Sequence, residues 1–261
     1  MNRPTGWNVC IPQELARGRP WIVEQEIALL QPDHWMDWSY RPLIPSDTHT
    51  PMLWTGDQAR LDGLVDRLAS SVSGATAMLF NEPERSEQAN MKPAVALYWT
   101  QAFLRAMWDT GAEFQWAAPG VSINMRDYDG LEWLTEYVRL MRRRGISRPS
   151  YWHVHAYHSD SPKQLREGWA KWQKWYTNWG NGAPVILSEV CATNLPDQRA
   201  VMDEFREMLA RREDNGVLGV YWFATHPTPV VDWPNACLCT INEEAETVSL
   251  TPLGEYYKSL R

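Results

Sequence analysis

Two glutamates stand at the ends of short apolar segments, where α/β enzymes keep their reactive groups. Glu82 follows the apolar run 77–80 (AMLF), and Glu189 lies in ILSEV at 186–190, shortly after the turn sequence NGAP at 181–184. A short continuous apolar run is typical of a strand that is buried on both faces in a parallel sheet. The carboxyl ends of such strands carry the catalytic residues of α/β barrels. We therefore predict that Glu82 and Glu189 lie at the same end of a sheet and act together.

Such a pair has the chemistry that glycoside hydrolysis requires. In that reaction two carboxyl groups flank the scissile bond, about 5 to 5.5 Å apart when the anomeric configuration is retained and farther apart when it is inverted. The alternation of Val185, Leu187 and Glu189 places Glu189 on one face of its strand. Asn81 and Glu82 are consecutive, so both side chains reach one site only if the strand end is bulged or twisted.

A structural role is the competing interpretation of a glutamate at a strand end. One such residue could form a salt bridge or cap the next helix, but two of them in similar strands favour a shared site. Glu84 is the local competitor of Glu82. Because Glu84 follows Pro83, we expect it to face solvent or to anchor a loop.

Histidines and tyrosines alternate along the predicted strand 151–158, YWHVHAYH, so that Tyr151, His153, His155 and Tyr157 share one face. His153 and His155 also have a spacing that suits metal ligands in barrel amidohydrolases. However, no second histidine pair and no lysine or aspartate stand in convincing positions. We expect His155 and Tyr157 to position a carboxylate and sugar hydroxyls, and His153 to be a hydrogen-bonded core residue. No catalytic triad or phosphate-binding loop is recognisable.

Sixteen tryptophans are the unusual feature of the composition. Aromatic side chains bury large areas, so many of them can pack between helices and strands. Others would line a groove, where flat rings stack on the apolar faces of sugars, and we expect Trp38, Trp54 and Trp116 among them. One aromatic stripe, on a helix that begins at Pro162, is typical of packing: Leu165, Trp169, Trp172, Tyr176 and Trp179.

The bulk properties exclude several classes of protein. The chain has 261 residues, and one α/β barrel needs about 250. The net charge of -7 and the pI near 5.4 argue against a nucleic-acid partner, which would require a basic face. No stretch approaches the roughly 18 apolar residues of a membrane span.

Neither the chain start nor the cysteines settle the compartment. Residues 1–10 have neither the basic start nor the apolar core of a signal peptide, so a cytoplasmic protein and a trimmed, secreted mature form both remain open. Four scattered cysteines are too few for a disulfide framework and are expected to be free thiols: Cys10, Cys191, Cys237 and Cys239.

Strands and helices alternate along most of the chain. We predict strands over 6–11, 34–40, 50–54, 77–80, 112–119, 151–158, 186–190 and 217–223. Helices are predicted over 20–31, 58–70, 93–110, 131–144, 196–214 and 253–260, and from Pro162 onward. This order indicates the α/β class with one domain, 1–261, folded as a single (β/α)8 TIM barrel. The pattern is weakest after the second strand, where a helix is missing.

Several short motifs resemble one clan of glycoside hydrolases. Asn-Glu-Pro at 81–83, His-Ala-Tyr at 155–157, Leu-Ser-Glu at 187–189 and Trp222 are similar to the corresponding strands of clan A. PMLW at 51–54, LFNEPE at 79–84 and the short chain most resemble glycoside hydrolase family 128, whose members cut β-1,3-glucans. TPLGEYY at 251–257 is similar to the end of many clan A barrels. The resemblance covers nearly the whole chain.

The resemblance implies a role for each matching residue. Glu82 would be the general acid/base, and Glu189 the nucleophile that forms a glycosyl-enzyme intermediate. Asn81 would bind the sugar 2-hydroxyl, Tyr157 would orient Glu189, and Trp222 would form the floor of the subsite beside the cleavage point. A raised pKa of the acid/base would follow from its closeness to the second carboxylate.

Some positions depart from the family pattern and leave the substrate open. The second strand of the family usually has Tyr-Asn-Trp, where this chain has Met36, Asp37 and Trp38. Its sixth strand usually has His-Trp-Tyr, where this chain has Ala156. Its seventh usually ends Thr-Glu-Phe, where this chain has Ser188, Glu189 and Val190. Mannan, xylan or β-1,4-glucan therefore remain alternatives to β-1,3-glucan.

The sequence thus predicts a retaining, endo-acting β-glycoside hydrolase that cleaves a β-glucan, with β-1,3-glucan as the substrate that the resemblance implies. We expect a monomer that acts on a polysaccharide or oligosaccharide, with no metal, organic cofactor, nucleic acid or membrane involved. The competing class is a carbohydrate-binding barrel without turnover. A metal hydrolase built on His153 and His155 is a third interpretation, which predicts loss of activity with a chelator.

Overall fold

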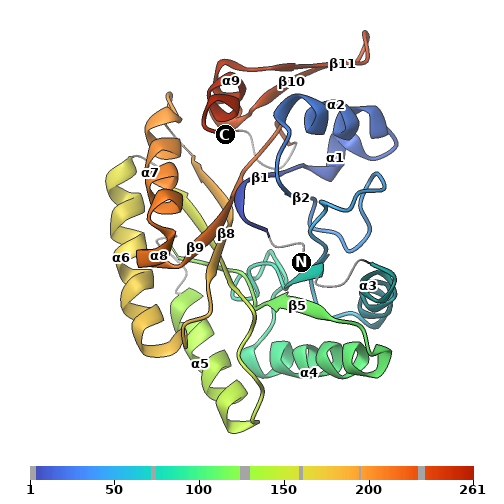
Figure 1. The fold of residues 1–261 in the computed structure, drawn as a ribbon, viewed down its shortest axis with the longest axis vertical. Helices are drawn as coiled ribbons and strands as arrows, with labels where there is room; N and C mark the ends of the chain where they lie inside the picture. The colour runs from blue at the N-terminus through green and yellow to red at the C-terminus, as the bar shows by residue number, and fades with distance from the viewer. Residues whose placement is uncertain (1–3, 72–74, 124–129, 159–160, 194, 229–232) are drawn as a thin grey trace.

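Parallel strands form the centre of the protein, and helices lie around them (Figure 1). The computed structural model describes residues 4–71, 75–123, 130–158, 161–193, 195–228 and 233–261. The central strands are β1 (Gly6–Cys10), β2 (Trp35–Met36), β3 (Met52–Leu53), β4 (Ala75–Leu79), β5 (Phe114–Ala117), β6 (Val121–Ser122), β7 (Trp152–His158), β8 (Val185–Ala192) and β9 (Val217–Trp222). β8 is buried along its whole length, as its apolar sequence predicts.

Hydrogen bonds arrange these strands in two parallel sheets. One has six strands in the order β2-β1-β9-β8-β7-β6, and the other has three in the order β3-β4-β5. Single bridges join segments that belong to or flank the two sheets: Trp35 with His49, Asn81 with Gly120, and Ala117 with Tyr151. The mixed α/β fold is therefore confirmed, whereas the described residues show two sheets and not one closed (β/α)8 barrel. β2, β3 and β6 have only two residues each, so little ladder forms where the sheets meet.

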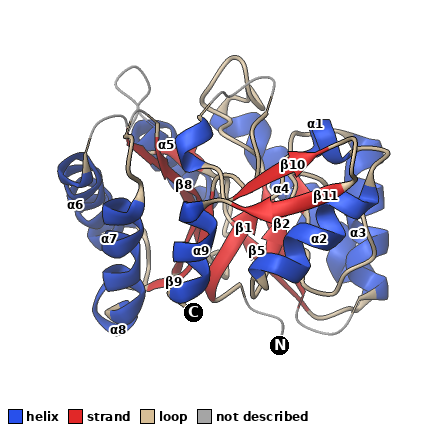
Figure 2. Cartoon of the chain, turned by 90° about the horizontal axis from the view of Figure 1, so that it is seen from above, coloured by secondary structure: helices blue, strands red, loops and turns tan. Residues whose placement is uncertain are grey.

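The helices follow the strands closely in sequence. They are α1 (Gln13–Ala16), α2 (Pro20–Leu30), α3 (Gln58–Ser70), α4 (Pro93–Thr110), α5 (Gly130–Arg143), α6 (Pro162–Trp179), α7 (Arg199–Ala210), α8 (Arg212–Asn215) and α9 (Pro252–Ser259). Figure 2 shows α6 and α7 on one side of the central strands and α2 and α3 on the other. Proline occupies the first turn of α2, α4, α6 and α9, where its missing N–H removes no helical bond.

Two segments differ from the sequence prediction. No strand was predicted between 223 and the final helix, but this segment contains an antiparallel hairpin of β10 (Cys239–Asn242) and β11 (Thr247–Leu250). The hairpin lies beside α2 (Figure 1). Its alternation of buried and exposed residues is too short to separate from a loop pattern. The predicted helix over 196–214 divides at Arg211 into α7 and α8.

Tryptophans fill much of the space between the strands and the outer helices. Trp172 and Trp175 of α6 stack with ring centroids 4.9 Å apart, and Trp175 meets Trp152 of β7 edge-on at 5.2 Å. Trp152 also donates its indole N–H to the Gly180 carbonyl at 2.8 Å. The predicted packing role of the α6 stripe is confirmed, although Trp175 and not Tyr176 is its third buried aromatic residue. No disulfide joins the four cysteines, which are all buried.

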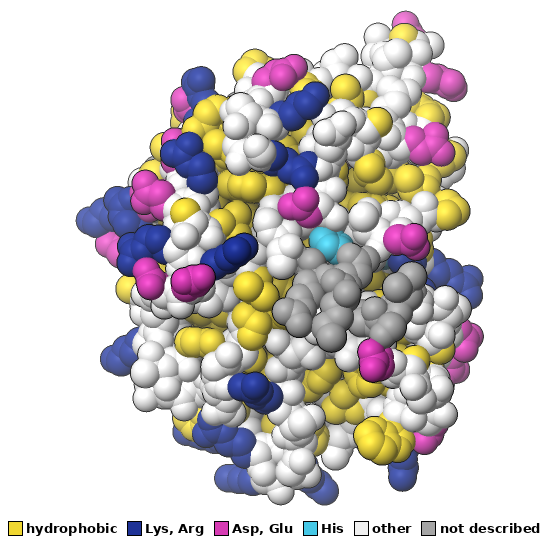
Figure 3. Space-filling model, viewed as in Figure 1, with side chains coloured by type: hydrophobic (Ala, Val, Ile, Leu, Met, Phe, Trp, Pro, Cys, Tyr) yellow, Lys and Arg dark blue, Asp and Glu magenta, His cyan; other side chains and the backbone are white. Residues whose placement is uncertain are grey.

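Charged side chains of both signs are interspersed over the face that Figure 3 shows. That face has no extended patch of one sign in the part of the chain that is described. Among the described helices, none combines the length and apolar character needed to cross a membrane.

A buried hydroxyl pair between α4 and α5 gives a test of this packing. Tyr137 of α5 and Thr100 of α4 are buried with their oxygens 2.8 Å apart, and the Thr100 hydroxyl donates to the Ala96 carbonyl. Tyr137→Phe removes one hydrogen bond, which is worth about 1 kcal/mol. We expect the melting temperature to fall by about 2–4 °C for a chain of this size.

The matched control is Tyr98→Phe on the outer face of α4, where the side chain is 63% exposed. This variant should melt with the wild type in differential scanning calorimetry. Equal losses in both variants would contradict the assigned role of the buried pair.

Candidate active site

Glu82 leaves the end of β4 in a strained backbone conformation. Phe80 has φ 53° and Glu82 has φ 41°, in the left-handed region that non-glycine residues adopt uncommonly. The Glu82 N–H donates to the Gly120 carbonyl at 2.8 Å, and the Asn81 N–H donates to the Trp54 carbonyl at 3.0 Å. The twisted strand end that the consecutive Asn81 and Glu82 require is therefore confirmed. The Glu82 residue is 2% exposed.

Glu189 lies within β8 and receives two side-chain hydrogen bonds. The indole N–H of Trp38 donates to its Oε1 at 2.6 Å. The hydroxyl of Tyr157, on β7, donates to its Oε2. Both donors stabilise the ionised carboxylate, and together they fix its orientation.

His155 lies between the two carboxylates. Its Nδ1 is 2.9 Å from Glu82 Oε1 and forms a hydrogen bond, while its Nε2 is 3.4 Å from Glu189 Oε1 without hydrogen-bond geometry. The β7–β8 ladder shifts register after Val154, which brings His155 opposite Glu189. Two strands and the end of a third therefore converge on one imidazole ring.

This arrangement shifts the pKa values of His153 and His155, both on β7, in opposite directions. Burial alone would lower the pKa of His155, but Glu189 and Glu82 raise it to about 9. Burial and the neighbouring His155 lower the pKa of His153 to about 3. His153 is hydrogen-bonded to Ser188 and to the Leu79 carbonyl, so its expected role as a core residue is confirmed. Among the described residues, no group of three or more His, Cys, Asp or Glu side chains is arranged to hold a metal ion.

The two carboxyl groups differ in the direction of their pKa shifts. Burial would raise the pKa of Glu82, but the hydrogen bond and charge of His155, followed by Arg85, hold it below its ordinary value. Burial raises the pKa of Glu189 and the Glu82 carboxylate adds to the effect, against the influence of His155, Trp38 and Tyr157. The expectation of a raised pKa for Glu82 is therefore wrong in the unliganded protein. It omitted the two cations that contact this carboxylate.

Arg85 contributes the second of those cations. Its Nη1 lies 2.9 Å from Glu82 Oε2, and its side chain is 16% exposed. On the same loop, Asn81 donates its amide to Gln88 at 3.1 Å, while Asn81 Oδ1 has no partner among the described residues. Arg85 lies three positions after Glu82 in the sequence, but nothing in that spacing identifies a loop that folds back on the strand end.

Glu84 anchors the loop that follows Glu82. Its Oε1 accepts the backbone N–H of Ser122 at 2.8 Å, so the expected anchoring role is confirmed. Burial raises the pKa of Glu84 to about 7, since the hydrogen bond from Ser122 offsets only part of the cost of its charge.

The predicted aromatic residues divide into two groups. Trp38 contacts Glu189 and is partly buried, and Trp54 is also partly buried, at the turn after β3. Trp116 is 4% exposed and Trp222 is fully buried, with its indole N–H donated to the Ala236 carbonyl at 2.7 Å. These two rings have no face open to a ligand, which corrects the prediction that they line a groove.

Phe223 occupies the place that was predicted for Trp222. Successive side chains of a strand point to opposite faces, so the residue after Trp222 faces the site. The Phe223 ring meets Tyr157 at 5.5 Å, Trp38 at 5.6 Å and Trp233 at 5.7 Å between ring centroids. Sequence analysis missed Phe223 and Trp233, and the alternation along 217–223 was the available signal for Phe223.

Comparison with known families agrees with this chemistry. A sequence profile described as "Glycosyl hydrolase catalytic core" matches residues 31–257. The chain belongs to this family. It is an O-glycosyl hydrolase whose described residues bring two buried carboxyl groups to the ends of parallel strands. No curated protein matches it significantly.

The fold of this glycosyl hydrolase is that of solved structures from glycoside hydrolase family 128. An endo-β-1,3-glucanase of subgroup I from Amycolatopsis mediterranei, in complex with laminaritriose, superposes with a TM-score of 0.72 at 21% identity, covering 98% of this chain and 100% of that one. A subgroup II endo-β-1,3-glucanase from Pseudomonas viridiflava gives 0.70 at 23% identity, covering 98% of each chain. A subgroup III curdlan-specific exo-β-1,3-glucanase from Blastomyces gilchristii, in complex with glucose, gives 0.64 at 19% identity, with 90% and 94% covered.

The bridging position of His155 has a titration signature. Its pKa of about 9 predicts an imidazolium at pH 7, which should lose its proton only as the pH rises past that value. In Glu82→Gln one of the carboxylates that raise this pKa is gone, so we expect His155 to titrate at lower pH. Chemical shifts of the His155 ring in an NMR pH titration measure the His155 pKa in the wild type and in Glu82→Gln.

His153 supplies the internal control, because its pKa of about 3 keeps it neutral in both proteins from pH 5 upward. An unchanged His155 titration in Glu82→Gln would contradict the bridging arrangement.

Proposed function

We propose that the protein is a retaining, endo-acting β-1,3-glucanase that works by double displacement. The observation that carries this proposal is that Glu82 and Glu189 contact opposite nitrogens of His155. Both carboxylates therefore reach one site from different strands, as double displacement requires, and the resemblance to clan A supports retention. The fold similarity to family 128 enzymes, one of them in complex with laminaritriose, supports β-1,3-glucan as the substrate.

Glu189 is the proposed nucleophile. Trp38 and Tyr157 both donate to its oxygens, and these bonds favour the ionised form that attacks the anomeric carbon. The attack forms a covalent glycosyl-enzyme intermediate and expels the leaving-group oxygen. Water then attacks the same carbon from the other side and releases the sugar with its original configuration.

Glu82 is the proposed acid/base, and it must carry a proton when the leaving group departs. In the unliganded site that proton resides on His155, whose Nδ1 is hydrogen-bonded to Glu82 Oε1. Binding of a sugar at Glu82 Oε2 would displace Arg85 and remove one of the charges that lower the pKa of Glu82. The His155 proton can then move to Glu82, which passes it to the leaving oxygen and later takes a proton from water.

The substrate groove is proposed to lie over the same residues. Asn81 is the proposed ligand of the sugar 2-hydroxyl, since its Oδ1 is buried without a partner among the described residues. Trp38 and Phe223 offer aromatic surface beside Glu189, in place of Trp222, and Trp54 is a further candidate at the end of β3. His155 and Tyr157 would orient the reacting groups.

We further propose that residues 1–261 form one catalytic domain with a single closed (β/α)8 barrel. The bridges between Trp35 and His49 and between Ala117 and Tyr151 support closure, because they connect strands across the two junctions between the sheets. The two carboxyl groups and one water molecule complete the reaction, so we propose that it needs no metal or organic cofactor. A monomer suffices for this site, because Glu82, His155 and Glu189 all come from one chain.

Hydrolysis of defined glucans tests the function. We expect reducing-sugar release from laminarin, with less or none from mannan, xylan and mixed-linkage glucan. Glu82→Gln should lower kcat by about 10²–10⁴-fold, the range for loss of a general acid/base. Glu189→Gln should lower it at least as much, because no intermediate can form.

Glu244→Gln is the matched control, since Glu244 is exposed and should tolerate the change without loss of activity. Proton NMR of the first product formed distinguishes retention from inversion. Reaction with azide and an activated aryl glycoside distinguishes the acid/base from the nucleophile. Glu82→Ala should give the β-glycosyl azide, and Glu189→Ala should give the α-glycosyl azide. An active enzyme that survives both Gln substitutions would refute the mechanism, and inactivity on every glycan would favour the carbohydrate-binding barrel.

A further inference from the structure

Asp37 and His49 form a buried pair outside the contacts of the two catalytic glutamates. Asp37 follows β2 and His49 precedes β3, and both side chains are completely buried. His49 Nε2 lies 2.7 Å from Asp37 Oδ1. His49 Nδ1 and Asp37 Oδ2 have no hydrogen-bond partner among the described residues. Their mutual bond is therefore the polar contact that fixes the His49 ring.

The backbone of His49 is held independently of that bond. It forms a bridge with Trp35, and the two rings meet edge-on with centroids 4.5 Å apart. Burial lowers the pKa of His49, against the opposing effect of Asp37. A neutral imidazole bonded to a carboxylate carries its proton on the bonded nitrogen, so Nε2–H donates to Asp37.

Asp37 in turn closes a tight turn around Trp38. Its Oδ1 also accepts the backbone N–H of Ser39 at 3.1 Å, the pattern of an Asx turn. Its backbone carbonyl accepts the amide of Gln13 at 2.7 Å. Trp38, inside the turn, has φ 58°, a left-handed conformation that tryptophan adopts only when its surroundings impose it.

We propose that Asp37 and His49 are positioning residues for Glu189 and act on it through Trp38. The inference rests on the proposed hydrolase function of the same site. His49 holds the Asp37 carboxylate where it binds Ser39, the resulting turn sets the direction of the Trp38 ring, and the ring donates its N–H to Glu189 Oε1 at 2.6 Å. The buried Asp37–His49 pair thereby stabilises the hydrogen bond between Trp38 and Glu189.

The direction of the effect on Glu189 follows from its surroundings. The charged and titratable groups that act on it are Glu82, His155, Tyr157, Cys10 and Cys191, from β4, β7, β1 and β8. The Trp38 bond favours the ionised carboxylate and lowers the pKa of Glu189 against the raising effect of burial. Loss of the bond must therefore raise this pKa further, and a nucleophile with a higher pKa becomes active only at higher pH.

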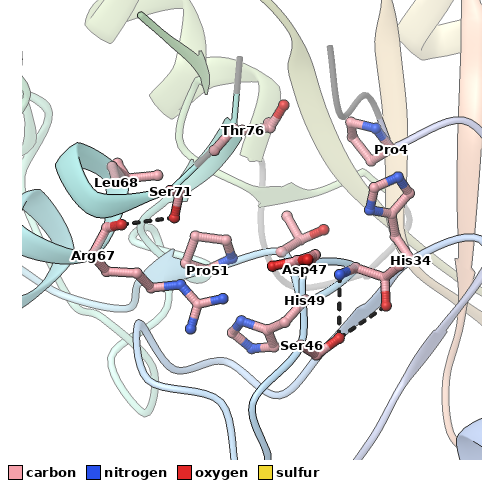
Figure 4. Close-up of a pocket in the computed structure, with 13 residues that line it drawn as sticks. Pro4, His34, Ser46, Asp47, His49, Pro51, Arg67, Leu68, Ser71 and Thr76 are labelled. Atoms are coloured by element: carbon pink, nitrogen blue, oxygen red, sulfur yellow. Dashed lines mark hydrogen bonds between the residues drawn. The ribbon is translucent and has the colours of Figure 1, made fainter. Parts of the chain in front are cut away.

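A cavity of about 310 Å³ lies beside His49 (Figure 4). Ser46, Asp47, His49, Arg67 and Thr76 are among its lining residues. The Arg67 charge lowers the pKa of His49 and so helps to keep the ring neutral.

The test compares His49→Leu, which removes the donor, with His49→Gln, whose amide keeps an N–H near the position of Nε2. His49→Leu should lower kcat on laminarin by roughly 10- to 100-fold, the range for a hydrogen bond to a charged group. KM should change less, and the acid limb of the pH–rate profile should move to higher pH by about 1. His49→Gln should recover most of kcat and the wild-type limb.

Two further proteins separate positioning from a loss of stability. Trp38→Phe should shift the acid limb as His49→Leu does, and the double variant should shift it no further, because His49 acts through Trp38. Thr50→Val removes the neighbouring buried bond to Tyr221, 2.6 Å long, and should lower stability without moving the limb. Additive shifts in the double variant, or an unmoved limb in His49→Leu, would overturn the inference.

A readout without catalysis distinguishes this inference from the proposed function. In ¹⁵N-labelled protein the Trp38 indole N–H, assigned by its loss in Trp38→Phe, should resonate downfield because it donates to a carboxylate. It should move upfield in His49→Leu and return in His49→Gln. If the wild type cleaves no glucan, the proposed function is wrong, but the indole resonance still tests the positioning role. An unchanged indole resonance in His49→Leu overturns that role whether or not the enzyme is active.

Discussion

The placement of one imidazolium between two buried carboxylates is the constraint on which the rest of the site depends. Burying three ionisable groups is costly unless each charge is compensated nearby. His155 offsets part of the charge of both glutamates, Arg85 adds a second cation to Glu82, and the donors on Glu189 stabilise its ionised form. Removing any one of these partners changes the protonation of the others, because the groups titrate as a coupled set.

The backbone is locally irregular at the strand ends that carry this cluster. Regular parallel strands would direct consecutive side chains to opposite faces, yet Asn81 and Glu82 are both buried at the end of β4. Positive φ at Phe80 and Glu82 resolves the conflict, and the bond from the Glu82 N–H to Gly120 holds the resulting conformation. Between β7 and β8, the register shift after Val154 brings His155 opposite Glu189. Strain of this kind persists only where surrounding contacts over-determine it, and here Phe80, Asn81 and Glu82 are all buried.

Sequence alone could predict the candidate site because its titratable groups follow the strand pattern. Apolar runs that end in glutamate gave Glu82 and Glu189, and alternation along 151–158 gave His155 and Tyr157. The lowered pKa of Glu82 was out of reach, since it depends on Arg85 folding back from a loop and on a histidine from another strand. Trp222 was misplaced by one residue because a motif match does not reveal strand parity, and Phe223 faces the site instead. The predicted closed barrel appears as two sheets in the described residues, because two-residue strands leave little ladder at the junctions.

The protonation pattern of the unliganded site is opposite to the one that the proposed mechanism requires. Glu82, with its lowered pKa, is ionised, whereas an acid catalyst must be protonated when the glycosidic bond breaks. Of the two side chains bonded to Glu82, His155 is completely buried and Arg85 is 16% exposed, so Arg85 is the one that an incoming sugar can displace. Its removal would raise the pKa of Glu82, so that the proton on the neighbouring imidazole could move to Glu82. Substrate binding would therefore convert Glu82 into an acid at the moment it is needed, while Trp38 and Tyr157 keep Glu189 in the form that attacks.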